Sequence, residues 1–206
     1  MNYSHIVFDV DGTLIDTFYS NMQSLQDTLK DLTGEVHPLE ELGRFFGIPG
    51  METAVQLGLD DPAAALRQWE QTLQRYRHTD RVYDGIPELL ETLSRAGLSL
   101  VVVTSRTRAE FDADFSILPI ARYFRTTITA SDTLRHKPEP DPLLEYIRRA
   151  GCDKEQVLFI GDSPFDMQCA AAAGVASGLA GWGATGPRPC THHFQTPQEV
   201  SALVLA

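Results

Sequence analysis

The chain has 206 residues, of which 43% are hydrophobic, and a formal net charge of −11. This is enough to bury the core of one α/β domain that carries an inserted module. The acidic balance argues against a non-specific binder of nucleic acid or anionic membranes, so any phosphate site must be local. We expect no nucleic-acid or membrane partner. Without a signal-peptide pattern or a membrane-length apolar run, we expect a cytoplasmic protein.

Short apolar runs bounded by turn residues predict the strands of a mostly parallel sheet. In chain order, the predicted strands are His5 to Val10, Leu98 to Val103, Thr126 to Ala130, Val157 to Ile160 and Val175 to Ala180. Helical patterns separate the later strands, which gives the β-α-β rhythm of a doubly wound fold. These predicted helices are Pro87 to Arg95, Thr107 to Ile117, Pro142 to Ala150 and Pro164 to Ala173.

The segment from about Asp16 to Arg81 breaks this rhythm. It has no strand pattern but contains helical stretches at Asp16 to Leu32 and Pro62 to His78. Asp16-Thr17 is a candidate amino-terminal cap for the first of them. We therefore predict a core domain made of residues 1–15 and 82–206, with an inserted helical domain at residues 16–81.

The three cysteines, Cys152, Cys169 and Cys190, are widely spaced and include no Cys-x-x-Cys pair. An odd, scattered set indicates reduced thiols rather than disulfides or a zinc site. Cys169 lies among alanines, so we expect it to contribute only to packing.

Two carboxylates follow the first predicted strand, in the segment Phe8-Asp9-Val10-Asp11-Gly12-Thr13-Leu14. Because the chain turns at Gly12, both acids can converge on one pocket outside the carboxyl end of the strand. Such a pair suggests a nucleophile, a proton carrier and a metal ligand. The alternatives are an aspartate-rich turn without chemistry or a fragment of a calcium loop.

Other polar residues follow later strands, where open α/β sheets bind ligands. Thr104 and Ser105 offer a hydroxyl and backbone amides to a phosphoryl oxygen, or else cap a helix. Lys137 lies beside prolines that limit its backbone freedom, or else is a solvated loop lysine. Asp162 and Asp166 lie at the start of a predicted helix, where helix capping by Asp162 or Ser163 is the alternative function.

Together, and in this order, these segments resemble the haloacid dehalogenase superfamily of phosphotransferases over nearly the whole chain. Phe8 to Leu14 is similar to the first motif of that family and Val103-Thr104-Ser105 to the second. Lys137-Pro138 is similar to the third, and Gly161-Asp162 with Asp166 to the fourth. The insertion resembles the α-helical cap of the phosphoglycolate phosphatase-like branch. The resemblance implies an α/β, doubly wound (Rossmann-like) core in which the Asp9 strand lies beside both the Thr104 and the Asp162 strands.

The resemblance also implies a mechanism. Asp9 attacks phosphorus to form an aspartyl-phosphate, and Asp11 serves as general acid and then base. Mg²⁺ is held by the Asp9 carboxylate, the Asp11 main-chain carbonyl and Asp162, with Asp166 supporting through water. The negative charge of the transferring phosphoryl group is taken up by Thr104, the Ser105 amide and Lys137.

The implied reaction is hydrolysis of a small phosphomonoester resembling 2-phosphoglycolate. The alternative substrates are pyrophosphate and then nucleotide or sugar phosphates. A sugar-phosphate mutase is a weaker alternative, because Asn21 occupies the position where those enzymes carry a histidine. The phosphonate hydrolases and dehalogenases of this superfamily lack the acid that Asp11 supplies, so the presence of Asp11 favours the hydrolysis of phosphate esters or anhydrides. A competing hypothesis from another functional class is a receiver-like signalling module that only holds phosphate. The inserted domain and Asp162 argue against it, because such a module needs neither.

The inserted domain supplies few candidates for substrate contact. Arg44 is one, as a partner for a substrate carboxylate, with a solvated helix arginine as the alternative. Trp182 either contacts the cap or is a buried structural residue. We expect a monomer or weak dimer acting on a small phosphorylated metabolite.

Overall fold

The computed structural model describes residues 3–206 of the chain. The described chain divides into two compact units. One comprises the segment that ends at Leu14 together with Val82–Ala206, and the other is Ile15–Arg81. The chain therefore crosses between the units twice, and each unit has a hydrophobic core of its own.

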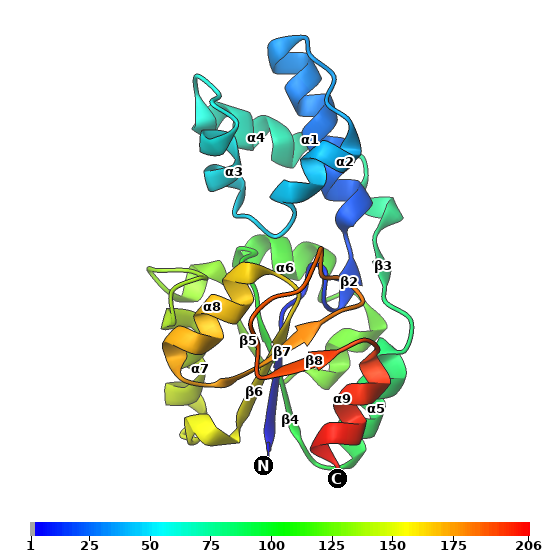
Figure 1. Ribbon diagram of the computed structural model, residues 1–206, viewed down its shortest axis with the longest axis vertical. Coiled ribbons are helices and arrows are strands. Elements are labelled where there is room, and N and C mark those ends of the chain that lie inside the picture. Colours follow the sequence, from blue (N-terminus) through cyan, green and yellow to red (C-terminus); the bar gives the residue numbers. More distant parts are fainter. Residues whose placement is uncertain (1–2) are drawn as a thin grey trace. The chain divides into compact units, whose positions relative to one another are not determined.

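A parallel sheet forms the centre of the first unit (Figure 1). Within the described residues it has six strands in the order β5-β4-β1-β6-β7-β8. The strands are β1 His5–Phe8, β4 Ser99–Val103, β5 Thr126–Ile128, β6 Val157–Gly161, β7 Ala176–Ala180 and β8 His192–Phe194. All neighbouring pairs are parallel, so their carboxyl ends meet at one edge of the sheet. The winding reverses at β1, which lies between β4 and β6, and this confirms the predicted doubly wound, Rossmann-like fold.

One face of the sheet packs against α7, Asp141–Ala150, and α8, Pro164–Ala173. Val7 and Phe159 project from the strands into this layer, where they meet Leu143 and Cys169. Cys169 is fully buried, and burial raises the pKa of its thiol to about 12. It is an unreactive packing residue, and all three cysteines are free thiols.

The opposite face carries another set of side chains, because neighbouring residues of a strand alternate in direction. Phe8 points this way and meets the ring of Phe124 edge-on, with 6.1 Å between ring centroids. Leu90 and Leu93 are fully buried on the helix between β3 and β4, which packs against β4 and against the last helix of the chain. The remaining elements of this unit are α5 Ile86–Arg95, α6 Arg108–Asp114 and α9 Pro197–Val204, with short 3₁₀ turns η3 Pro119–Tyr123, η4 Ala130–Asp132 and η5 Lys154–Gln156.

The second unit is helical. Its elements are α1 Phe18–Thr33, α2 Leu39–Leu42, α3 Gly50–Gln56 and α4 Pro62–Leu73, with 3₁₀ turns η1 Gly43–Phe45 and η2 Arg77–Thr79. Leu25, Phe45 and Trp69 contribute to its buried core. The Trp69 indole nitrogen donates to the Ser24 hydroxyl at 2.9 Å, which satisfies its polar atom inside that core. Two-residue strands, β2 Ile15–Asp16 and β3 Arg81–Val82, pair where the chain enters and leaves this unit.

Several predicted boundaries were wrong. The first helix begins at Phe18, where the Asp16 carboxylate accepts from the Phe18 amide at 3.2 Å. Thr17 is fully buried and its side chain caps nothing. The helix predicted from Pro62 to His78 ends at Leu73. Strand β8 and helices α2, α3 and α9 were not predicted. Strand β8 and helix α2 have three and four residues, which is too few to show a periodic pattern.

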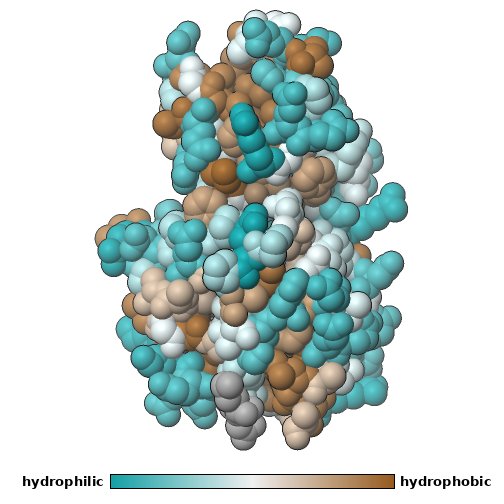
Figure 2. All heavy atoms as spheres, in the orientation of Figure 1, coloured by the Kyte–Doolittle hydropathy of each residue, from teal (hydrophilic) through white to brown (hydrophobic). Residues whose placement is uncertain are grey.

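The visible face of each unit carries mostly hydrophilic side chains, with apolar ones scattered among them (Figure 2). Scattered apolar residues are normal on a protein surface. Among the described residues, none of the helices combines the length and the apolar character needed to span a bilayer.

Candidate active site

The carboxyl end of β1 leads directly into a tight turn at Gly12. Gly12 has φ +81°, a left-handed conformation that side chains disfavour, and a Cβ placed on it would lie 2.3 Å from a carboxylate oxygen of Asp162. Glycine is therefore required here for two reasons. The turn brings the first acidic segment against the acid that follows β6, as the strand order predicts.

A buried lysine joins two of the predicted acids. The Lys137 ammonium lies 2.7 Å from Asp9 Oδ1 and 2.6 Å from Asp166 Oδ1. Burial alone would lower the pKa of Lys137, but the Asp166 and Asp9 carboxylates raise it above its ordinary value. Lys137 is thus a fixed cation beside Asp9, although the three residues come from distant parts of the chain.

Asp9, Asp162 and Asp166 form a compact acidic cluster. All three are buried, and each offers an oxygen within 4.8 Å of the others. Burial raises the pKa of Asp9 to about 7, although Lys137 opposes that rise. Burial, then the charges of Asp166 and Asp9, raise the pKa of Asp162 well above its usual value. Three buried carboxylates with one ammonium carry excess negative charge, and their oxygens are the donors that hard divalent cations prefer. The cluster fits a divalent metal ion.

The orientation of Asp162 and Asp166 has local causes. The Thr13 hydroxyl donates to Asp162 Oδ1 at 2.9 Å. Ser163 caps α8, and Asp166 Oδ2 accepts from both the amide and the hydroxyl of Ser163. The capping alternative therefore applies to Ser163, while Asp162 is left facing the cluster. Both oxygens of Asp166 already accept hydrogen bonds, which suits a supporting position.

The Asp11 carboxylate lies outside this acidic cluster and is held by Arg106. The guanidinium donates through Nε and Nη2 to the two Asp11 oxygens, at 2.8 and 2.6 Å. A second carboxylate, Asp114, lies 3.7 Å from Arg106 Nη1. Such a two-bond fork fixes the orientation of a carboxylate. Sequence reasoning missed Arg106: a basic residue two positions after Thr104 was the available signal, but nothing local indicated its partner.

Thr104 and Ser105 follow β4 at the same edge of the sheet. Thr104 is buried, and its hydroxyl oxygen accepts from the Arg106 amide at 3.2 Å. Ser105 is exposed. The cap of α6 is Thr107, which forms a reciprocal capping box with Glu110. The helix-cap alternative for Thr104 and Ser105 is therefore excluded, and this segment ends at the site with the Thr104 hydroxyl proton still available.

The loop after β7 packs on the turn that follows β1. The Trp182 indole nitrogen donates to the Thr13 carbonyl oxygen at 2.9 Å. A Cβ on Gly183 would lie 1.7 Å from the Gly12 carbonyl oxygen, so the two backbones are in direct contact. Trp182 is half-buried and braces the segment that carries Thr13, the residue that orients Asp162.

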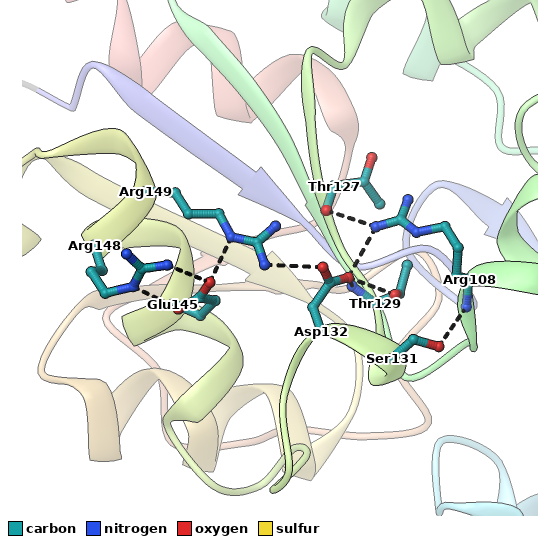
Figure 3. Close-up of polar contacts among 8 residues, drawn as sticks. All are labelled: Arg108, Thr127, Thr129, Ser131, Asp132, Glu145, Arg148 and Arg149. Atoms are coloured by element: carbon teal, nitrogen blue, oxygen red, sulfur yellow. Dashed lines mark hydrogen bonds and ion pairs between the residues drawn. The ribbon is translucent and has the colours of Figure 1, made fainter.

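An ionic network fixes the loop that runs from β5 toward Lys137 (Figure 3). Asp132 Oδ2 accepts from the Thr129 amide and hydroxyl, at 2.9 and 2.7 Å, and from Arg108 at 2.9 Å. Its other oxygen accepts from Arg149 of α7 at 3.0 Å. Partial burial opposes these bonds, but together they hold the pKa of Asp132 below its usual range. The loop therefore leaves the sheet from a rigid base.

Arg44 belongs to the helical unit. It is exposed on η1, and its guanidinium carbon lies 4.7 Å from the centre of the Phe45 ring. The other predicted site residues all lie in the sheet-bearing unit, at the carboxyl ends of β1, β4 and β6 and in the loop that carries Lys137.

A doubly wound sheet with buried acids at the ends of β1 and β6, a buried lysine and a hydroxyl-bearing segment after β4 is typical of hydrolases that act through an aspartate. The family model "Haloacid dehalogenase-like hydrolase" matches residues 6–180. The chain belongs to this family. It is an enzyme of the phosphatase type, a phosphoric monoester hydrolase, and it is similar to members of the phosphoglycolate phosphatase-like branch.

Named relatives span most of the chain. It is 31% identical over 190 residues to "Putative pyrophosphatase PpaX" of Caldanaerobacter subterraneus, covering 88% of this chain and 83% of that protein. It is 31% identical over 204 residues to the N-acetylmuramic acid 6-phosphate phosphatase of Pseudomonas aeruginosa, and the match covers 94% of this chain and 88% of that protein. The crystal structure of a putative phosphoglycolate phosphatase from Lactobacillus plantarum superposes with a TM-score of 0.89 at 29% identity, covering 98% of this chain and 100% of that one.

Proposed function

We propose that this enzyme hydrolyses a small phosphomonoester, of the size and charge of 2-phosphoglycolate, through an aspartyl-phosphate on Asp9. The observation that carries the proposal is the position of Asp9 between a buried lysine and two further buried acids. A carboxylate so placed is oriented and needs no base to activate it. The names of the relatives support small phosphorylated substrates.

The proton-transfer steps fall to Asp11. We assign it the protonation of the leaving oxygen and the later activation of the water that hydrolyses the aspartyl-phosphate, since these are two directions of one transfer. Asp11 is about one-third exposed, with a side-chain exposure of 32%. That exposure supports the assignment, because substrate and water must both reach it.

The remaining groups bind charge. Thr104, the Ser105 amide and Lys137 take up negative charge on the transferring phosphoryl group, and the charge of Lys137 also favours the ionised form of Asp9. Asp9, the Asp11 carbonyl and Asp162 would hold Mg²⁺, with Asp166 supporting. When bound, that ion lowers the repulsion between substrate and carboxylates and polarises the phosphoryl oxygens.

We propose that the helical unit, residues 15–81, is the cap that selects the substrate. The two neighbouring crossings of the chain, at Leu14–Ile15 and Arg81–Val82, support this role because they allow the unit to move as one body. Arg44 is exposed and carries a charge suited to a substrate carboxylate. We keep a monomer or weak dimer as the proposed assembly, since a moving cap needs free space.

Inorganic pyrophosphate is the second candidate, favoured by the pyrophosphatase name of a relative that spans most of the chain. A mutase is disfavoured. Asn21, at the position where such mutases carry histidine, uses its side-chain amide to donate to the Thr17 carbonyl at 2.9 Å. It offers the site no titrating group.

The test is phosphate release by the purified protein from 2-phosphoglycolate, pyrophosphate, p-nitrophenyl phosphate, nucleoside monophosphates and hexose phosphates, with Mg²⁺ and with a chelator. We expect Mg²⁺-dependent release concentrated on a compact substrate. Release from none of these compounds would contradict the proposed substrate class and mechanism. Equal phosphate release with Mg²⁺ and with the chelator would contradict the proposed role of the metal ion.

A further inference from the structure

We propose that Arg106 determines substrate class by binding a second anionic group, a carboxylate or a phosphate, on the leaving portion of the substrate. The inference rests on the proposed phosphatase function and narrows it. The favoured substrates are phosphate esters or anhydrides whose leaving group is itself negatively charged. Esters with neutral leaving groups are disfavoured.

The first argument is how Arg106 is anchored. Its amide donates to the Thr104 hydroxyl oxygen, and its carbonyl accepts from the Ala130 amide at 2.9 Å. Its side chain is only 7% exposed. The guanidinium therefore stands at a defined place beside the residues proposed to bind the phosphoryl group, and it is not a mobile surface arginine.

The second argument is the division of the two buried cations. Lys137 lies between Asp9 and Asp166, so it serves the side of the attacked phosphoryl group. Arg106 lies against Asp11, the residue proposed to meet the leaving oxygen. The charge of Arg106 therefore lies on the side of Asp11, where the proposed mechanism places the leaving portion of the substrate.

The third argument is chemical shape. A planar guanidinium fork matches carboxylate and phosphate oxygens, whereas an ammonium is a point charge. Both fork positions now bind the two oxygens of Asp11. An anionic leaving group has the same geometry and can take over one of those positions. The exchange would release one Asp11 oxygen toward the leaving oxygen, so that recognition of the second anion and positioning of the acid occur together.

The competing explanation is an ion pair that only orients Asp11. Orientation alone would help every substrate equally, because each one needs the same proton carrier. Recognition by Arg106 would help only substrates that bear the second anion. The two explanations therefore differ in selectivity, not in overall rate.

The experiment compares 2-phosphoglycolate with its methyl ester, which keeps the phosphoryl group and removes the second negative charge. We would measure kcat/KM for both compounds, with p-nitrophenyl phosphate as a general reporter of turnover. The variants are Arg106→Gln, which removes the charge, and Arg106→Lys, which keeps the charge but loses the fork. Arg95→Gln is the matched control, because it removes one positive charge from an exposed pair with Glu91.

We expect the wild-type protein and Arg95→Gln to prefer the acid over the ester. Arg106→Gln should lower that preference about tenfold or more, the size expected when a charged hydrogen-bond partner is lost. The preference of Arg106→Lys should lie between those of the wild type and Arg106→Gln. This variant keeps the test valid where the glutamine variant does not fold. An equal loss on acid and ester would overturn the proposal and leave Arg106 as a positioning residue for Asp11. Turnover of p-nitrophenyl phosphate without any preference between acid and ester in the wild type would overturn this inference alone. No turnover of any compound would overturn the proposed function with it.

Discussion

Two cations stand at the carboxyl edge of the sheet, and their surroundings differ. Lys137 is paired with side chains that are 8% and 0% exposed, Asp9 and Asp166. Arg106 is paired with side chains that are 32% and 24% exposed, Asp11 and Asp114. The lysine group, which is Lys137 with Asp9 and Asp166, is sealed from solvent. The arginine group, which is Arg106 with Asp11 and Asp114, is partly exposed to solvent through its two acids. The difference suggests that the phosphoryl side of the site is rigid and common to many substrates, whereas the leaving-group side is where substrates are distinguished.

The largest expected effect comes from the sealed side. Asp9→Asn should abolish phosphate release, by a factor of at least ~10³, because an amide cannot act as the nucleophile. The fold should remain, since Asn occupies the same volume. Rates should be measured on the best substrate of the panel, with circular dichroism to check the fold.

The matched control is Asp112→Asn, an exposed acid on α6, which should keep full activity. Substantial residual release by Asp9→Asn would contradict the assignment of Asp9 and, with it, the contrast between the two sides.

Lys137→Met should cost both activity and stability. Removing the ammonium leaves Asp9 and Asp166 buried without a cation, and breaking a buried pair in this way costs about 3–5 kcal/mol. The free energy of unfolding in urea, measured without metal, tests this. Addition of Asp9→Asn to the same chain should recover part of the loss, because one of the unpaired charges is gone. No loss of stability would show that the lysine group is less sealed than its burial indicates.

Thr13→Val should weaken metal binding. The Thr13 hydroxyl orients Asp162, and loss of such a supporting hydrogen bond lowers metal affinity by about 10–100-fold. Calorimetric titration with Mg²⁺ or Mn²⁺ measures the change directly.

Thr13→Ser should restore the affinity, since it keeps the hydroxyl. Equal weakening by valine and serine would point to packing, not to the hydrogen bond, as the contribution of Thr13.

The smallest expected effect is a pH dependence of stability without metal. Burial raises the pKa of Asp9 to about 7 from an ordinary value of 3.8. Between these values the folded state binds a proton that the unfolded chain has released, so stability falls as pH rises through this window. We expect stability to fall across this window, and to fall less in Asp9→Asn. Urea unfolding at several pH values tests it; stability that rises with pH from 4 to 7 would contradict it.

The sequence predicted the elements whose patterns are long or strongly apolar. β1, β4 and β6 and the helices between the later strands were found because buried strands read as continuous runs of branched residues and these helices keep a clear period. The strand order placed the Asp9, Thr104 and Asp162 segments at one edge. The short strand β8 was missed because three residues, two of them histidines, carry no periodic signal.

The candidate site was predicted as a set of residues but not as a set of contacts. Asp9, Asp162 and Asp166 come together as buried neighbours, which motif order at strand ends could indicate. The bonds from Arg106 to Asp11 and from Trp182 to Thr13 join residues 95 and 169 positions apart. Both partners had to be placed in space first, because a side chain carries no mark of its distant partner.

By itself, then, the amino-acid order determined the alternation of strands and helices, the inserted helical segment and the acids at the strand ends, because these depend on local periodicity and turn chemistry. Only the tertiary structure decided which cation serves which acid: Lys137 for Asp9 and Asp166, Arg106 for Asp11. The reason is physical. A buried charge is stable only beside a partner, and which partner lies within 3 Å depends on how the β4, β5 and β6 loops pack together, not on any one of their sequences.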